Sequence, residues 1–112
     1  MIRRATVDDA AAIASIEDRV DPDGWTAATA ARHLSGPLCQ AWVVDEDGVV
    51  AHLITTVVTD EAEVITVAVD PDHRRRGLAL ALLDAAASAW AAAGVRRAFL
   101  EVHVDNAGAR AL

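Results

Sequence analysis

The run from Gly77 to Ala93 constrains the fold more than any other part of the sequence, because Ala and Leu dominate it and both are strong helix formers. Gly94 follows directly, and glycine is the residue that most often ends a helix in a left-handed conformation. Segments rich in β-formers stand on either side, at Glu63 to Val69 and Arg97 to Val104. Strand, helix and strand in this order predict a right-handed crossover with two parallel strands.

The chain before this crossover predicts a strand, two helices and a hairpin. The acidic stretch from Asp45 to Gly48 is the hairpin turn, and the third strand completes an antiparallel meander. The fold class is therefore α/β (α+β), with a mixed, mostly antiparallel sheet and flanking helices in a single domain over residues 1–112. The expected earlier elements are strands at Ile2 to Ala5, Gln40 to Asp45 and Val49 to Thr59, and helices at Val7 to Val20 and from Trp25-Thr26 to Gly36-Pro37.

The net charge indicates which kind of partner the protein can bind, and the cysteine content indicates the compartment in which it works. The formal net charge is −7, and all ten basic residues are Arg, which disfavours a nucleic-acid or anionic membrane surface and favours a cationic partner. The single Cys39 excludes an intramolecular disulfide, and the N-terminus lacks the apolar core of a signal peptide. No uncharged apolar run is long enough for a membrane span. We expect a cytoplasmic protein, and the Ala-, Arg- and Asp-rich composition suggests a GC-rich bacterial source.

The loop between the third strand of the meander and the long helix carries the strongest functional signal. Backbone N–H groups at a helix start lack intrahelical partners and lie at the positive end of the helix dipole, which suits a diphosphate. Gly77 and Ala79 keep side chains small there, and Arg74 to Arg76 add positive charge. An arginine run alone is more often a solvated turn, but the strand, glycine and helix around it favour an anion site. Neither a Walker loop nor a Rossmann fingerprint matches the spacing.

Arg74, Gly77 and Ala79 match the Arg/Gln-x-x-Gly-x-Gly/Ala pyrophosphate loop of the GNAT N-acetyltransferase superfamily, which this chain resembles. The resemblance covers essentially the whole chain and is greatest to the ribosomal-protein-alanine N-acetyltransferases, the RimI type. The segments that carry it are VAVDPDHRRRGLALALL, Gly94-Val95, Leu100-Glu101-Val102 and Asn106.

This resemblance implies acetyl-CoA as the acyl donor. The strand from Val67 to Val69 would offer backbone groups to the pantetheine arm, and an N–H there would polarise the thioester carbonyl. The loop and first helical turn would wrap the pyrophosphate, and Asn106 would contact the cofactor near its thiol end. The implied cofactor-binding residues are Val67, Ala68, Val69, Arg74, Arg75, Arg76, Gly77, Leu78, Ala79, Leu80 and Asn106.

Glu101 is the catalytic base that the resemblance implies. It stands between Leu100 and Val102 on a strand predicted to be central, where an unpaired carboxylate is costly and its pKa can shift. Without the resemblance, a lone strand Glu is more often a partnered structural residue. Regular alternation turns His103 to the opposite face, so we rank it below Glu101.

The remaining candidate residues predict no metal site and no further acid. The histidines share no spacing with Cys39 or with a carboxylate pair that would hold a metal ion, so they are interpreted as structural or surface residues. Asp70 and Asp72 flank a proline and are interpreted as turn formers. The three histidines considered are His33, His52 and His73.

The sequence departs from the family pattern at its C-terminal end. The pattern continues after Asn106 to a tyrosine that protonates the leaving thiolate and to two final strands, whereas this chain has no Tyr and ends at Leu112. We expect a domain that is incomplete at its C-terminus, either a fragment of a longer product, which we favour, or a shortened homologue that has lost part of the machinery. The strand at Arg97 to Val104 would then be an exposed edge, able to pair with a second copy.

These features favour an N-acetyltransferase acting on an amine, with the N-terminal α-amine of a protein, such as a ribosomal protein, as the expected acceptor. Deprotonating a Lys side chain at neutral pH costs roughly 3 kcal/mol more than deprotonating an α-amine, so a single carboxylate base suits the α-amine. A small-molecule amine is the alternative acceptor. A CoA-binding or interaction module without turnover is the alternative function, and the net charge disfavours a nucleic-acid contact made by the arginines.

Overall fold

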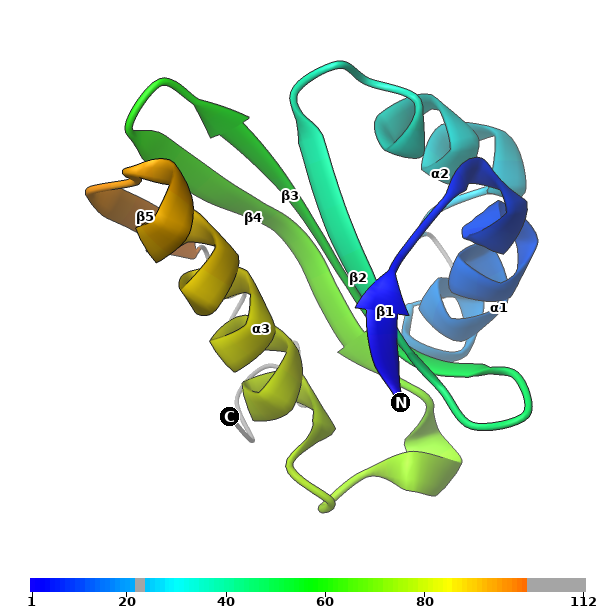
Figure 1. The fold of residues 1–112 in the computed structure, drawn as a ribbon. Coiled ribbons are helices and arrows are strands. Elements are labelled where there is room, and N and C mark those ends of the chain that lie inside the picture. The colour runs from blue at the N-terminus through cyan, green and yellow to red at the C-terminus, as the bar shows by residue number, and fades with distance from the viewer. Residues whose placement is uncertain (22–23, 101–112) are drawn as a thin grey trace.

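The computed structural model describes residues 1–21 and 24–100, which form one five-stranded sheet with helices on both faces (Figure 1). The strands are β1 (Ile2–Arg4), β2 (Cys39–Asp45), β3 (Val49–Val58), β4 (Glu61–Val69) and β5 (Arg97–Leu100). The helices are α1 (Ala10–Val20), α2 (Ala27–Leu34) and α3 (Leu78–Ala93), with short 3-10 helices η1 (Val7–Asp9) and η2 (Pro71–His73).

The strand order is β1-β2-β3-β4-β5, and every neighbouring pair is antiparallel except β4 and β5, which are parallel. This arrangement confirms the predicted mixed sheet, the meander of β2, β3 and β4, and the crossover through α3. Element bounds agree with the sequence to within a few residues, except that the predicted end of the last strand at Val104 lies outside the described residues. The predicted first helix differs at its start, because the chain makes a 3-10 turn at Val7–Asp9 before the α-helix begins at Ala10.

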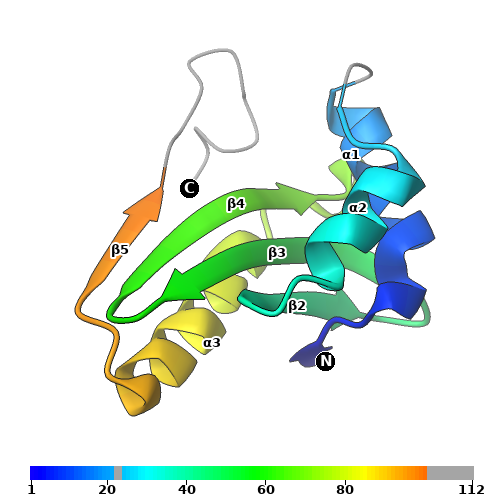
Figure 2. The same cartoon turned by 90° about the horizontal axis from the view of Figure 1, so that it is seen from above.

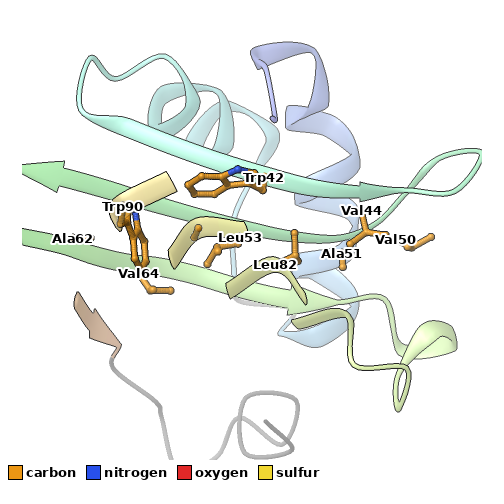
Figure 3. Close-up of a cluster of buried hydrophobic side chains, with 10 residues drawn as sticks. Trp42, Val44, Val50, Ala51, Leu53, Ala62, Val64, Leu82 and Trp90 are labelled. Atoms are coloured by element: carbon orange, nitrogen blue, oxygen red, sulfur yellow. The ribbon is translucent and has the colours of Figure 1, made fainter. Parts of the chain in front are cut away.

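Two apolar layers hold the helices on the sheet, because alternate residues of each strand point to opposite faces. Helix α3 covers one face, where Leu82 and Trp90 pack against Trp42 and Leu53 of the sheet (Figure 3). Helices α1 and α2 cover the other face, as the two views of the fold show (Figures 1 and 2). The buried residues of this second layer are Ala10, Ile13, Ala30, Ala41, Val43 and Ile54.

Local capping explains why the helices start and end where they do. The Asp9 carboxylate accepts a hydrogen bond from the Thr6 N–H at 2.8 Å, and the Thr26 hydroxyl accepts one from the Thr29 N–H at 3.1 Å. Gly94 ends α3 with a φ of +82°. These residues match the helix boundaries that the sequence predicts.

Strand β5 lies at the edge of the described sheet, the position predicted for it if the two final strands of the family pattern are absent. It pairs with β4 alone among the described residues, and all of its four residues are exposed, including Phe99 at 50%. The predicted pairing of this edge with a second copy stays a prediction. None of the helices in residues 1–21 and 24–100 is long and apolar enough to cross a membrane.

Candidate functional site

The site is centred on the edge of β4 that faces away from β3. Within the described residues, only the first half of this edge is paired with another strand, and we call the second half the open edge. Pairing with β5 joins Glu61–Val64 to Arg97–Leu100, and β4 then continues to Val69 while it stays paired with β3. Figure 2 shows β5 beside the first part of β4, and all four residues of β5 belong to this paired stretch. Within the described residues, no strand lies beside residues 65–69 on this side. Backbone N–H and C=O groups on such a strand edge can pair with an extended ligand, as an added strand does.

A β-bulge marks the point where this open edge begins. Thr55 of β3 pairs with Val64 and Ile54 pairs with Thr66, so Ile65 is an extra residue without a partner in β3. Bulges bend a strand and end its regular pairing, and they are common beside active sites. The bulge therefore changes the direction of β4 just after Val64, the last residue of β4 that pairs with β5 in the described part of the chain.

Side chains of the predicted strand segment are part of the protein interior. Val67 and Val69 pack against the layer under α3, and Ala68 is 8% exposed and pairs with His52 on the opposite face. Ala68 is therefore buried, and Val67 and Val69 are partly buried. The predicted role of Val67, Ala68 and Val69, which uses backbone groups, stays a prediction.

The loop that follows β4 is held in place by Asp70 and by Arg19 of α1. The Asp70 carboxylate accepts a hydrogen bond from the Asp72 N–H at 2.9 Å, and Arg19 contacts Asp70 at 2.7 Å and Asp72 at 3.2 Å. The hydrogen bond from Asp72 and the nearby Arg19 charge lower the pKa of Asp70. Both aspartates are turn formers, as predicted, and the bridge to Arg19 is a contact that the sequence does not reveal.

The end of this loop has the backbone geometry of an anion site. Arg75 and Gly77 have φ values of +65° and +72°, and left-handed residues in such turns can direct neighbouring N–H groups toward one point. Gly77 has no side-chain cap, so the first N–H groups of α3 remain unpaired by a cap. A Cβ on Gly77 would meet no atom of the described protein within 4 Å, which leaves room for a ligand.

The three arginines of the loop differ in their partners. Arg76 makes a paired contact with Glu46 in the β2–β3 turn, at 2.9 and 2.7 Å, which lowers the pKa of Glu46. Arg74 and Arg75 are exposed and have no ion pair within the described part of the chain. The side chains free to meet a phosphate are therefore those of Arg74 and Arg75, and Arg76 would contribute its backbone.

The first turn of α3 contains the other predicted contacts. Leu78 is half-buried and Leu80 is 55% exposed. Ala79 is 9% exposed, so packing against the protein, rather than a ligand, requires a small side chain there. The predicted base Glu101 and the predicted cofactor contact Asn106 lie outside the described residues. Among residues 1–21 and 24–100, no group of His, Cys, Asp and Glu is arranged to hold a metal ion.

A buried polar cluster on the other face of the sheet was not found from the sequence. The Glu17 Oε1 atom lies 2.8 Å from His52 Nε2 and accepts a hydrogen bond from the Thr66 hydroxyl at 2.6 Å. The cluster joins α1, β3 and β4. One signal for it exists in the sequence, because Glu17 lies four residues after the inward-facing Ile13 and so shares its helix face.

Comparisons with known proteins agree with this geometry. The model of the acetyltransferase (GNAT) family matches residues 9–112. The [ribosomal protein bS18]-alanine N-acetyltransferase of Escherichia coli (strain K12) is 36% identical over 97 residues, which cover 87% of this chain. The chain spans 66% of the length of that relative.

Solved structures give the same relationship. The crystal structure of the ribosomal-protein-S18-alanine N-acetyltransferase from Escherichia coli superposes with a TM-score of 0.88 at 34% identity, covering 99% of this chain and 72% of that one. The PaiA N-acetyltransferase from Thermoplasma acidophilum, solved in complex with coenzyme A, gives a TM-score of 0.83 at 12% identity, covering 99% and 84%. At that identity the second match concerns the fold alone.

Proposed function

The chain belongs to the acetyltransferase (GNAT) family, and on this premise we propose that it is an N-acetyltransferase that moves an acetyl group from acetyl-CoA to an amine. The observation that carries this proposal is the continuity of the site. The open edge of β4 leads directly into an uncapped helix start with two unpaired arginines. An extended arm that ends in a diphosphate fits these two parts in that order.

The residues present suit coenzyme A as the group that is bound. The backbone of Val67–Val69 would hold the pantetheine arm as an added strand. The N–H groups from Gly77 to Leu80 would receive the diphosphate, with Arg74 and Arg75 supplying charge-assisted hydrogen bonds. The space above Gly77, where a Cβ would meet no protein atom within 4 Å, supports a close approach of a ligand to the backbone.

Acetyl-CoA supplies an activated thioester when it is bound. An N–H on the open edge of β4 would donate to the carbonyl oxygen, where negative charge develops as the amine attacks. A new N–C bond forms, the C–S bond breaks, and the amine loses a proton. Glu101 is the proposed acceptor of that proton, acting directly or through a water molecule.

We propose the N-terminal α-amine of a protein, a ribosomal protein being the first candidate, as the acceptor. The 36% identical relative is named for a ribosomal protein alanine, which supports this choice. The net charge of −7 also suits a basic protein as partner. A small-molecule amine is the competing acceptor.

Calorimetry with acetyl-CoA, followed by measurement of thiol release with a peptide that begins with Ala, tests the proposal. We expect binding and thiol release, with the acetyl group found on the peptide N-terminus. Binding without release from any amine would reduce the function to a CoA-binding module. The absence of binding would show that the site does not bind acetyl-CoA. Thiol release with small amines alone would show that the acceptor is a small-molecule amine.

A further inference from the structure

The cluster of Glu17, His52 and Thr66 holds a charged group in an interior position. Glu17 is 7% exposed and His52 is fully buried. Burial opposes ionisation, but the hydrogen bonds from His52 and Thr66 outweigh it, and the pKa of Glu17 is lowered. Glu17 therefore remains a carboxylate at neutral pH.

This arrangement is costly for folding alone. A buried charge loses its hydration, and replacing such a group with an apolar side chain is often neutral or stabilising. The second ring nitrogen of His52, Nδ1, is buried and has no hydrogen-bond partner among the described residues. Such an unsatisfied buried atom requires an explanation, and a functional role of the cluster is one.

The cluster lies next to the open edge of β4. Thr66 follows the bulge at Ile65 and directly precedes Val67, where the proposed contact with the pantetheine arm begins. The hydrogen bond from Thr66 therefore ties the Glu17 carboxylate to the strand that would hold the thioester. Glu17 comes from α1, on the sheet face that α3 does not cover.

Only one face of the sheet gives an acceptor access to this edge. The face under α3 is closed, because Val67 and Val69 of β4 pack with Leu78 and Leu82 of the helix in one apolar layer. An amine that reaches a thioester on the open edge must therefore come from the face of α1 and α2. Two carboxylates near that face are buried in the described residues, Asp9 and Glu17, and Glu17 is the one that contacts β4.

Part of the Glu17 carboxylate is unused. Oε1 carries both hydrogen bonds, and Oε2 has no partner within the described part of the chain. About one tenth of the side chain remains accessible, at 9%. A carboxylate has about four acceptor sites, so Oε2 can receive an N–H from an incoming group.

We propose that Glu17 binds the acceptor amine through Oε2, while His52 and Thr66 fix its orientation through Oε1. The inference rests on the proposed acetyl transfer and adds the residue that recognises the acceptor. Because the hydrogen bonds from His52 and Thr66 lower its pKa, the Glu17 carboxylate is a weaker base than an ordinary Glu. Its role is to bind and orient the amine, and deprotonation belongs to another group.

Peptide binding to the protein saturated with coenzyme A tests this role without the need for turnover. The probes are a short peptide that begins with Ala and the same peptide with an acetylated N-terminus. We expect the wild-type protein to bind the free-amine peptide about tenfold or more tightly, because a hydrogen bond to a carboxylate is lost on acetylation. Equal binding of the two peptides, or binding of neither, would overturn the proposal.

Glu17→Gln keeps the shape of the side chain and leaves an amide oxygen for Thr66. We expect it to weaken free-amine binding by about tenfold or more, to leave the acetylated peptide unaffected, and to keep acetyl-CoA affinity within about twofold. Asp84→Asn is the matched control, since it removes one carboxylate charge from an exposed position on α3. An equal loss in both variants would show a general charge effect and contradict the assignment.

Kinetics separate binding from a purely structural role. In Glu17→Gln we expect the KM for the peptide to rise while the KM for acetyl-CoA stays unchanged, whereas a distorted β4 would raise both. If the wild-type protein binds the free-amine peptide selectively but releases no thiol, the proposed function fails and the assignment of Glu17 stands. If thiol release is normal and Glu17→Gln leaves the peptide KM unchanged, only the assignment fails.

Discussion

Arg76 and Glu46 form a paired ion contact, with Nη1 2.9 Å from Oε1 and Nη2 2.7 Å from Oε2. Arg76 stands just before α3 and Glu46 stands in the turn between β2 and β3, so the contact joins two loops that are far apart in the sequence. Both side chains are partly exposed, so the pair contributes little to stability. The pair engages the side chain of Arg76, whereas Arg74 and Arg75 have no ion pair within residues 1–21 and 24–100.

The first prediction compares two neighbouring arginines in acetyl-CoA binding. Arg75→Gln removes a free charge at the proposed diphosphate site, and we expect a loss of affinity of about tenfold or more, from a charge-assisted hydrogen bond of about 1.5–3 kcal/mol. Arg76→Gln is the matched control and should lose less, because its side chain is already bound to Glu46. Calorimetry at low and high salt measures both, and the loss in Arg75→Gln should shrink as salt screens the charge. An equal loss in both variants would contradict the division of roles.

The second prediction concerns the proposed base. Glu101→Gln keeps the shape of the side chain and removes the proton acceptor, so kcat should fall by about a hundredfold or more while acetyl-CoA affinity is unchanged. Steady-state rates near neutral pH and calorimetry check the two parts. A normal kcat in this variant would move general-base catalysis to another residue or to water.

The third prediction follows from the bond between Asp9 and Arg3. The Asp9 carboxylate accepts hydrogen bonds from Arg3 at 2.9 and 3.0 Å, and this contact lowers the pKa of Asp9. A lowered pKa in the folded state stabilises the fold above the ordinary Asp pKa near 3.9, and that stability is lost as pH falls through the lower folded value.

Thermal melting between about pH 7 and pH 2 measures this effect. The wild-type Tm should fall as the pH drops below about 4. Asp9→Asn should have a lower Tm at neutral pH and a smaller difference from the wild type at acid pH. A Tm difference that stays constant over this range would show that the charge of Asp9 does not contribute.

The fold could be predicted from the sequence because its signals are local. Gly77 and Gly94 frame one long helix, β-formers stand on both sides of it, and the caps at Thr6 and Thr26 lie within three residues of their partners. The anion loop could be predicted for the same reason, since its glycine and arginines are consecutive. Strand, loop and helix follow one another in the sequence, so the pattern that identifies the loop is local.

The contacts that refine the site depend on residues distant in sequence. Glu17 meets His52 and Thr66, which are 35 and 49 positions away, and Arg76 meets Glu46, which is 30 positions away. No periodicity encodes these pairs, because packing of α1 and of the β2–β3 turn brings them together. The sequence does not reveal the bulge at Ile65 either, because one extra residue leaves the β-forming composition of the strand unchanged.

The last prediction uses the two glycines at the ends of α3 as a matched pair. Gly77 and Gly94 have φ values of +72° and +82°, and a Cβ on either would meet no protein atom within 4 Å. An alanine at either position therefore brings the same backbone penalty, about 1–2 kcal/mol, and no clash within the described protein. Both Gly77→Ala and Gly94→Ala should lower Tm by a similar amount.

Acetyl-CoA binding should distinguish these two variants. The methyl group at Gly77 would enter the space proposed for the diphosphate, whereas Gly94 lies at the other end of a helix of 16 residues. We expect Gly77→Ala to lose about tenfold or more in affinity, with little dependence on salt because the effect is steric. Gly94→Ala should bind as the wild type does. Equal affinities in the two variants, after equal losses of stability, would mean that no ligand approaches the backbone at Gly77, and the diphosphate would have to bind elsewhere.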